Sequence, residues 1–285
     1  MQTLEGIKKR IQSIGVIKKM THAMLLVASV KFKKQTKLFK QISDYCHDYY
    51  DIFNSLIKSY GCDYPILDTQ KQKDLPDLYI VVTSNLGLCG SYNSNICKLV
   101  TQNLKSNDKM VIFGKKGFLF FKNRNMLEQI IENFDYDKDQ NLYFNLMALA
   151  YFINQKYLNY QFKKVYLVYT KFISSIKFVP TIQQILPISY SQFADKQTKT
   201  PPQIIEPNIK KVIEKTMIAY ITNLLYGGVS ESILCQYASQ KNVMDGASKN
   251  ASELIDQLKL TFNRLRQETI TQEINEIIAG TNSNR

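Results

Sequence analysis

The last third of the chain, from Asn208 to Ala279, contains no proline and repeats its apolar residues at helical spacing. At about 100° per residue, one third of the helix circumference collects an apolar stripe. This stripe consists of Met244, Ala247, Ala251, Leu254, Ile255, Leu258, Phe262 and Leu265. A continuous helix here would be on the order of 100 Å long, whereas a compact chain of this length has a radius of gyration near ~19 Å. We therefore expect the helix to project, with its stripe covered by another helix or by a partner.

The apolar surface turns around this helix near its end. Ile270, Ile274, Ile277 and Ile278 are centred about 140° away from the first stripe, whereas drift between a 3.5 and a 3.6 repeat gives only about 20° per heptad. We expect one surface to cover the helix up to Leu265 and another to cover it beyond Thr269. The alternative is a short break, followed by a second helix that packs back.

A second long helix is predicted at the other end of the chain. No proline occurs between Thr3 and Ser59, and apolar residues again recur in threes and fours. Two overlong amphipathic helices at opposite ends predict an antiparallel coiled coil with a separate body inserted between them. The expected parts are residues 1–59 (N-terminal coiled-coil helix), 74–190 (inserted α/β domain) and 208–280 (C-terminal helix that pairs with the first).

The net charge of +13 and the isoelectric point near 9.3 indicate an acidic partner, which could be nucleic acid, an anionic membrane or an acidic protein surface. The run Lys31–Lys37 could bind nucleic acid, although Lys33 and Lys37 fall opposite Phe39, which favours a solvated helix face. The basic N-terminal region also resembles a transit peptide. Its periodic pattern is too long for one, so we interpret it as mature structure.

The sequence has few of the residues that disulfide frameworks, metal sites and His-based catalytic sites require. Five cysteines without a CxxC motif argue against a disulfide framework, and His22 and His47 are the only histidines. We therefore expect no metal, no cofactor and no His-based catalytic machinery. The longest uninterrupted apolar run, around residues 147–153, is too short to span a bilayer.

The middle of the chain alternates strands and helices, which predicts a small, mostly parallel, Rossmann-like α/β domain. Residues 71–77 are predicted to be a boundary, and residues 190–207 a surface connection. The predicted strands are 78–83, 110–113 and 165–173, with an edge strand in 176–188 because of Pro180 and Pro187, and the predicted helices are 92–104 and 141–157.

The first predicted strand runs into a loop that contains Gly87 and Gly90. This loop matches neither GxGxxG nor GxxxxGK[ST], and residues 83–96 contain no Lys or Arg. The glycines are better explained by a tight turn from strand to helix than by a nucleotide site. Cys89 beside a helix N-terminus could be an activated nucleophile, but no nearby base supports that role.

Four segments together resemble the gamma subunit of F-type ATP synthases, in the correct order and over nearly the whole chain. They are Lys19–Ser29, Thr83–Gly90, Met244–Ala251 and Leu258–Gly280, of which the last is the most specific. Asn85 and Leu86 replace the family's usual Asp-Arg, which implies the loss of any ion pair made by that loop. The regulatory two-cysteine insertion of chloroplast members is absent.

Gly227 and Gly228 lie within the long C-terminal helix. Each costs up to about 1 kcal/mol relative to Ala in a helix, so we expect a kink or short break there.

The resemblance implies a rotating central shaft without catalytic residues of its own. In the family, the two terminal helices form a coiled coil inside a hexamer of alternating catalytic and non-catalytic subunits, and the α/β body sits near the membrane rotor c-ring. The implied partners are the hexamer subunits, delta/epsilon-type stalk subunits and the c-ring, with one copy of this chain in the complex and no nucleic acid. The shaft couples proton-driven rotation to ATP synthesis by contacting the catalytic sites unequally.

The same resemblance implies which residues contact the hexamer. These shaft–ring contacts are Met24, Arg266, Gln267, Thr271, Glu273, Ile274 and Ile277. Met24 would pack against the hexamer, and the polar residues would form ion pairs or hydrogen bonds with it. For Arg266 and Glu273 the alternative is a solvated helix surface.

Two other classes of function stay open: a small α/β nucleotide-binding enzyme, and a basic coiled-coil scaffold for nucleic acid. For location, composition favours the matrix side of the mitochondrial inner membrane. The alternative is the cytoplasmic face of a bacterial inner membrane.

Overall fold

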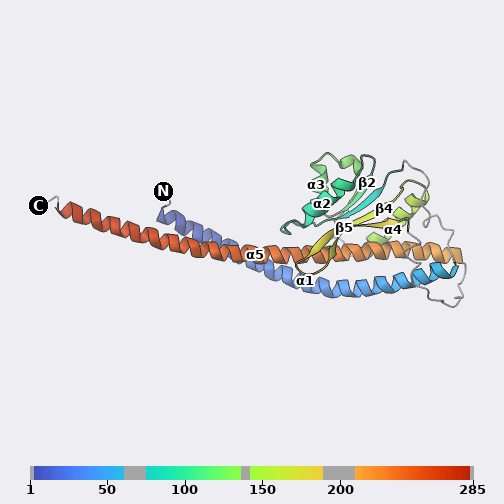
Figure 1. The fold of residues 1–285 in the computed structure, drawn as a ribbon, viewed down its shortest axis with the longest axis horizontal. Helices are drawn as coiled ribbons and strands as arrows, with labels where there is room; N and C mark the ends of the chain where they lie inside the picture. Colours follow the sequence, from blue (N-terminus) through green and yellow to red (C-terminus); the bar gives the residue numbers. More distant parts are fainter. Residues whose placement is uncertain (1–2, 61–74, 136–141, 189–208, 283–285) are drawn as a thin grey trace. The chain divides into compact units, whose positions relative to one another are not determined.

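A computed structural model describes residues 3–60, 75–135, 142–188 and 209–282 (Figure 1). The predicted connection at 190–207 and most of the predicted boundary at 71–77 lie outside the described residues. The chain divides into two compact units, one made of residues 1–30 with 240–285 and the other of residues 31–239. Helix α1 (Leu4–Tyr60) and helix α5 (Ile209–Asn282) each contribute to both units.

Both predicted long helices are present, with 57 residues in α1 and 74 in α5. The expected break at Gly227 and Gly228 is wrong, because α5 continues through both glycines without interruption. The alternative of a second helix beyond Leu265 is wrong for the same reason. Tertiary contacts hold the glycine pair in helical conformation, since Gly228 is buried against strand β4 (Val165–Phe172).

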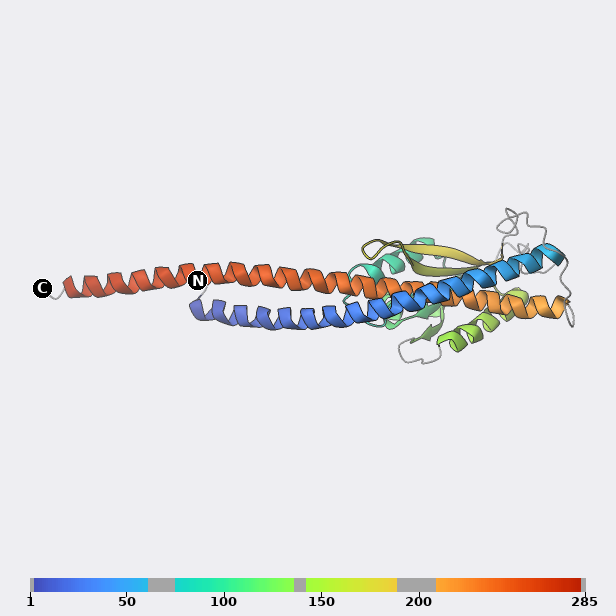
Figure 2. The same cartoon turned by 90° about the horizontal axis from the view of Figure 1, so that it is seen from below.

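In the first unit, the ends of α1 and α5 run antiparallel and side by side (Figure 2). Their shared core consists of Ile7, Ile14, Ala251 and Leu258, with Ile11, Ile255, Phe262 and Leu265 packed against it. The α5 members all belong to the stripe identified from the sequence. The antiparallel coiled coil is thus confirmed, together with the register that places this stripe at the seam.

The second unit is built on a sheet of five strands in the order β3-β2-β1-β4-β5. Strand β1 (Leu78–Val82) pairs in parallel with β2 (Lys109–Phe113) and with β4, and β2 pairs in parallel with β3 (Ile130–Phe134). Strand β5 (Phe178–Leu186) is antiparallel and lies at the edge, as Pro180 predicted. The mostly parallel α/β fold is confirmed, although the sequence patterns did not identify β3, which is short and largely exposed.

Helices cover both faces of this sheet (Figure 1). On one face lie α2 (Tyr92–Asn103) and α3 (Lys115–Lys122), the latter not predicted. A short 3-10 turn, Leu127–Gln129, leads into β3. On the other face, α4 (Leu142–Leu158) packs with α1 and α5 around Phe53, Tyr157 and Leu225. The inner parts of both long helices therefore belong to the core of the α/β unit.

Helix α1 also meets the length and composition criteria for a membrane span, which the search for uninterrupted apolar runs missed. Only 11% of the qualifying window is buried. Core helices and N-terminal signal sequences meet the same criteria, so they do not assign a membrane segment here. The criteria do indicate an apolar and mostly exposed surface on α1.

Candidate functional site

The end of α5 has two chemically different sides. At about 100° per residue, Arg266, Ile270, Glu273, Ile274 and Ile277 fall within an arc of about 100°. The isoleucines of this arc are exposed, Ile274 by 51% and Ile277 by 68%. We call these five residues the tip face. It lies away from the coiled-coil seam, as the turned apolar pattern predicted.

The opposite side of the same segment is polar, and its side chains bond to one another. Arg264 Nε donates a 3.0 Å hydrogen bond to Glu268 Oε1, and Gln272 Nε2 donates a 2.9 Å bond to Glu276 Oε1. Both pairs are one helical turn apart, the spacing at which side chains on a helix surface meet. These four residues lie within an arc of about 120° that faces away from the tip face.

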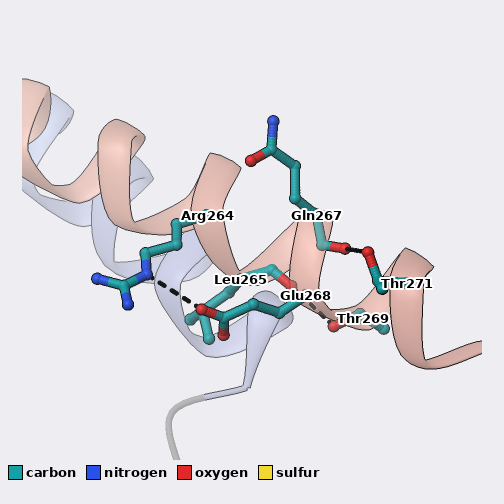
Figure 3. A network of polar contacts seen from close by, with 6 residues as sticks. All are labelled: Arg264, Leu265, Gln267, Glu268, Thr269 and Thr271. Carbon is teal, nitrogen blue, oxygen red and sulfur yellow. Dashed lines mark hydrogen bonds and ion pairs between the residues drawn. The ribbon is translucent and has the colours of Figure 1, made fainter.

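The structure brings four of the predicted contact residues together on the tip face: Arg266, Glu273, Ile274 and Ile277. Within the described residues, no ion pair or side-chain hydrogen bond is recorded for Arg266 or Glu273. Gln267 and Thr271 lie beside this face, where the Thr271 hydroxyl donates a 2.9 Å bond to the Gln267 carbonyl (Figure 3). Arg264 and Glu268, by contrast, are paired with each other, although both side chains are exposed.

Met24 lies on α1, and no described contact joins it to the tip face. It is half-buried, at the margin of a second exposed apolar surface. This surface, which we call the α1 stripe, consists of Val16, Ile17, Met20, Val27 and Val30, each more than half exposed. The sequence analysis missed it. The recurrence of its members at three, four and seven residues, outside the seam positions, was the available signal.

The carboxyl edge of the sheet is where a doubly wound fold would bind a nucleotide. The strand order reverses between β1 and β4, and ligands of such folds sit in the crevice at that point. Here α5 contacts both sides of the crevice. The Ser239 hydroxyl donates to the Cys89 carbonyl at 2.6 Å, and the Cys235 thiol donates to the Thr170 carbonyl at 3.4 Å. The chain's own helix thus takes the position of a ligand.

The glycine loop between β1 and α2 is built for a turn rather than for catalysis. Gly90 and Leu88 adopt positive φ values of 55° and 62°. Cys89 is buried, and this burial raises the pKa of its thiol, which opposes formation of a nucleophilic thiolate. The tight turn agrees with the sequence interpretation, and the raised pKa gives no support to Cys89 as an activated nucleophile.

Asn85 also has a structural role in this loop. Its amide Nδ2 donates a 2.6 Å bond to Asp135 Oδ1, and its Oδ1 accepts from the Lys115 backbone N–H at 3.1 Å. Lys115 Nζ in turn lies 3.1 Å from Asp135 Oδ2. The loop itself forms no ion pair within the described residues, but its neutral amide joins one. Leu86, the other departure from the family pattern, is exposed.

Within the described ranges, no group of three or more His, Cys, Asp or Glu side chains could hold a metal ion. The described acids and lysines near the tip lie on the surface of a single helix rather than in a cleft. The chemistry this region offers is recognition of another protein surface by apolar packing and paired charges.

Comparison with known proteins agrees with this geometry. The model of the ATP synthase family matches residues 3–283. An ATP synthase gamma chain from Malacoplasma penetrans is 39% identical over 98% of this chain and 99% of the relative, and one from Mycoplasma capricolum is 35% identical over 99% of each.

Solved structures share the fold. The mitochondrial ATP synthase central stalk and c-ring of Tetrahymena thermophila contains a chain that matches with a TM-score of 0.62, 22% identity and coverage of 80% of this chain and 99% of that chain. A chain of the Euglena gracilis mitochondrial ATP synthase matches with a TM-score of 0.56, 15% identity and coverage of 92% and 95%. With a family model that spans almost every residue and relatives of equal length, the chain belongs to the ATP synthase family as a gamma chain.

Proposed function

We propose that this gamma chain acts as the central shaft of an F-type ATP synthase. It couples proton-driven rotation of the membrane ring to conformational changes at the catalytic sites of the surrounding hexamer, and it carries no catalytic residue itself. Family membership supports this role, as do two continuous helices that join the α/β unit to the coiled coil. The shaft changes each site only to the extent that it binds one conformation better than another.

The two-sided end of α5 is the observation that carries the proposal. A solvated helix has no reason to concentrate isoleucines on one side while its polar side chains pair on the other. An apolar sleeve around the tip face would bury Ile270, Ile274 and Ile277, which are 46%, 51% and 68% exposed. Arg266 and Glu273 would then find partners of opposite charge on the hexamer, and Gln267 and Thr271 would contact it beside them.

The α1 stripe provides a second contact surface for the same partner. Met24 lies at its margin, where a flexible, polarizable side chain adapts to changing neighbours. A helix surface with five apolar residues that are each more than half exposed is typical of an interaction site. The hexamer subunits would cover this site, and the net charge of +13 would favour acidic loops on them.

The remaining partners follow from the family role. We assign delta/epsilon-type stalk subunits and the membrane rotor c-ring to the α/β side of the chain, with a single copy of this chain in the complex. The functional parts are residues 1–59 and 208–280 as the coiled-coil helices and 74–190 as the inserted domain. The close packing of Phe53 and Leu225 with the sheet supports torque transfer between the inserted domain and the helices.

This chain would lie peripherally on the membrane-bound complex, either on the matrix side of a mitochondrial inner membrane or on the cytoplasmic face of a bacterial inner membrane. The relatives named above come from mycoplasmas, at 35–39% identity, which supports the cytoplasmic face of a bacterial membrane. The mitochondrial matrix location stays a prediction. The mitochondrial structures that share the fold are only 15–22% identical, so they favour neither compartment.

Affinity purification through the full-length chain tests the shaft role. We expect recovery of an assembled ATPase, and a chain that ends at Leu265 should recover the same subunits with slower or uncoupled ATP turnover. This truncation keeps the described coiled-coil core intact. A free, monodisperse chain without ATPase subunits would contradict the proposal. Salt-sensitive capture of nucleic acid would instead favour the scaffold function.

A further inference from the structure

One side of α5 within the α/β unit carries a row of small and polar residues. Gly228, Glu231, Ser232, Cys235 and Ser239 recur at helical spacing and fall within an arc of about 100°. Four of them are buried, and Glu231 is half-buried. We call these residues the docking stripe. Buried hydroxyl and carboxylate groups are costly in a helix face unless each finds a partner.

The docking stripe finds partners in three different elements of the sheet's carboxyl edge. Ser232 Oγ accepts from the Thr170 backbone N–H at 3.2 Å and lies 2.8 Å from the Tyr92 hydroxyl at the start of α2. The Ser239 hydroxyl donates to Cys89 of the glycine loop at 2.6 Å.

The half-buried member of the stripe extends the contact along β4. Glu231 Oε1 accepts from the Phe172 backbone N–H at 2.8 Å. Together these bonds place Glu231 and Ser232 on one turn of α5 and Ser239 about two turns further along, each bonded to a different point of the α/β unit.

These bonds add a directional restraint to the apolar packing of α5. Dispersion and burial are not directional, so apolar contacts resist rotation of a helix only through the close fit of the core. Hydrogen bonds weaken steeply with angle, so rotation of α5 would break all of these bonds together. Each buried donor or acceptor left unpaired costs about 1–3 kcal/mol, which opposes rotation or sliding of the helix.

We propose that Glu231, Ser232 and Ser239 are positioning residues that lock the rotational setting of α5 to the α/β unit, so that torque applied to this unit turns the shaft without slip. The inference rests on the shaft role proposed above. In this interpretation, the crevice between β1 and β4, where doubly wound folds bind their ligands, holds the chain's own helix α5.

The test uses membranes that contain the complete ATP synthase with Ser232→Ala, Ser239→Ala or both. Ser230→Ala is the matched control. Ser230 is 2% exposed, close to the 0% of Ser232, yet it lies about 160° around the helix from Ser232 and makes no described side-chain bond to the sheet. Proton pumping and ATP hydrolysis are measured in the same vesicles, and hydrogen exchange of the Thr170 amide is followed in the intact complex.

We expect Ser232→Ala to increase exchange of the Thr170 amide about tenfold, because the amide loses its buried acceptor. Protons pumped per ATP should fall by about half or more against a proton gradient in the double variant, while Ser230→Ala matches the wild type. An assembled double variant with an unchanged ratio of pumping to hydrolysis would overturn the proposal and leave the stripe a purely structural contact.

A second pair of variants tests the proposal independently if the serine variants fold poorly. Glu231→Ala removes the acceptor for the Phe172 amide, whereas Glu231→Gln keeps an amide oxygen in the same place. Pumping per ATP should fall in the first and recover in the second, and equal ratios in both would also overturn the proposal. Failure of the shaft role itself is distinguishable, because the wild-type chain would then recover no ATPase at all.

Discussion

Gly228 of α5 and Leu167 of β4 approach so closely that a Cβ atom at position 228 would lie 2.5 Å from Leu167 Cδ2. Leu167 is fully buried and cannot move aside without disturbing the core. The neighbouring Gly227 faces α1 instead, where an added Cβ would lie 3.5 Å from Cys46 Sγ, an ordinary contact distance. The two glycines therefore let α5 pass between a helix and a sheet.

This asymmetry predicts opposite effects for the same substitution. Gly228→Ala should destabilise the chain by about 1–3 kcal/mol through overpacking. Gly227→Ala should be neutral or stabilise it by up to about 1 kcal/mol, because alanine has the higher helix propensity. Urea unfolding of both variants checks the prediction, and equal free energies of unfolding would contradict the close approach.

The hydrogen bond between Asn85 and Asp135 predicts a loss of stability in one variant that a second substitution restores. Asn85→Asp would place two carboxylates at the present 2.6 Å contact, with Asn85 only 6% exposed, and should cost about 1–3 kcal/mol. Adding Asp135→Asn should recover most of the loss by restoring an amide donor. A double-mutant cycle in thermal unfolding measures the coupling, and additive single effects would rule out the direct bond.

The two sides of the α5 tip predict different consequences for two arginines. Arg266→Ala should reduce ATP turnover of the assembled complex by about tenfold, the usual effect of losing a charged contact. Arg264→Ala removes only an exposed pair within the helix and should change turnover by less than about twofold. Similar losses in both variants would show that the tip face is not the contact surface.

Two cysteine thiols, one half-buried and one buried, predict a loss of stability in alkali. Burial raises the pKa of Cys46 to about 11 and that of Cys97 to about 12, from 9.0 in both cases. Below about pH 8 these thiols are mostly neutral in the folded and unfolded states. As the pH rises from about 9 towards 11 and 12, only the unfolded chain releases the protons readily, so stability falls. Urea unfolding between pH 8 and 10.5 should show this decline, and Cys97→Ala should flatten it.

Periodicity and turn chemistry predicted the elements that depend on local pattern. The stripe from Met244 to Leu265 predicted the coiled-coil seam because a long helix exposes the same face at every turn. The apolar run that begins at Leu78 predicted a buried parallel strand for a similar reason. The largely exposed β3, with Glu132 and Asn133 in its middle, offered no such signal.

The candidate site was accessible to sequence reasoning only in part. The turned isoleucine face identified one side of the tip, because helical spacing alone assigns residues to sides. It did not separate Arg266 from Arg264, although the spacing of Arg264 and Glu268, one helical turn apart, was a local signal for their pairing. The roles of Met24 and the tip residues stay predictions until the contacts are measured.

By itself the sequence determined that this chain has two long terminal helices, a parallel α/β unit between them and an apolar surface that turns near the end of α5. These properties follow from the 3.6-residue and two-residue periods, which are local. Only the tertiary structure decided that Gly227 and Gly228 leave α5 unbroken, that Asn85 bonds to Asp135 and that Ser232 and Ser239 occupy the crevice at the sheet's carboxyl edge. Each of these outcomes depends on residues distant in sequence, whose distances and angles no periodicity encodes.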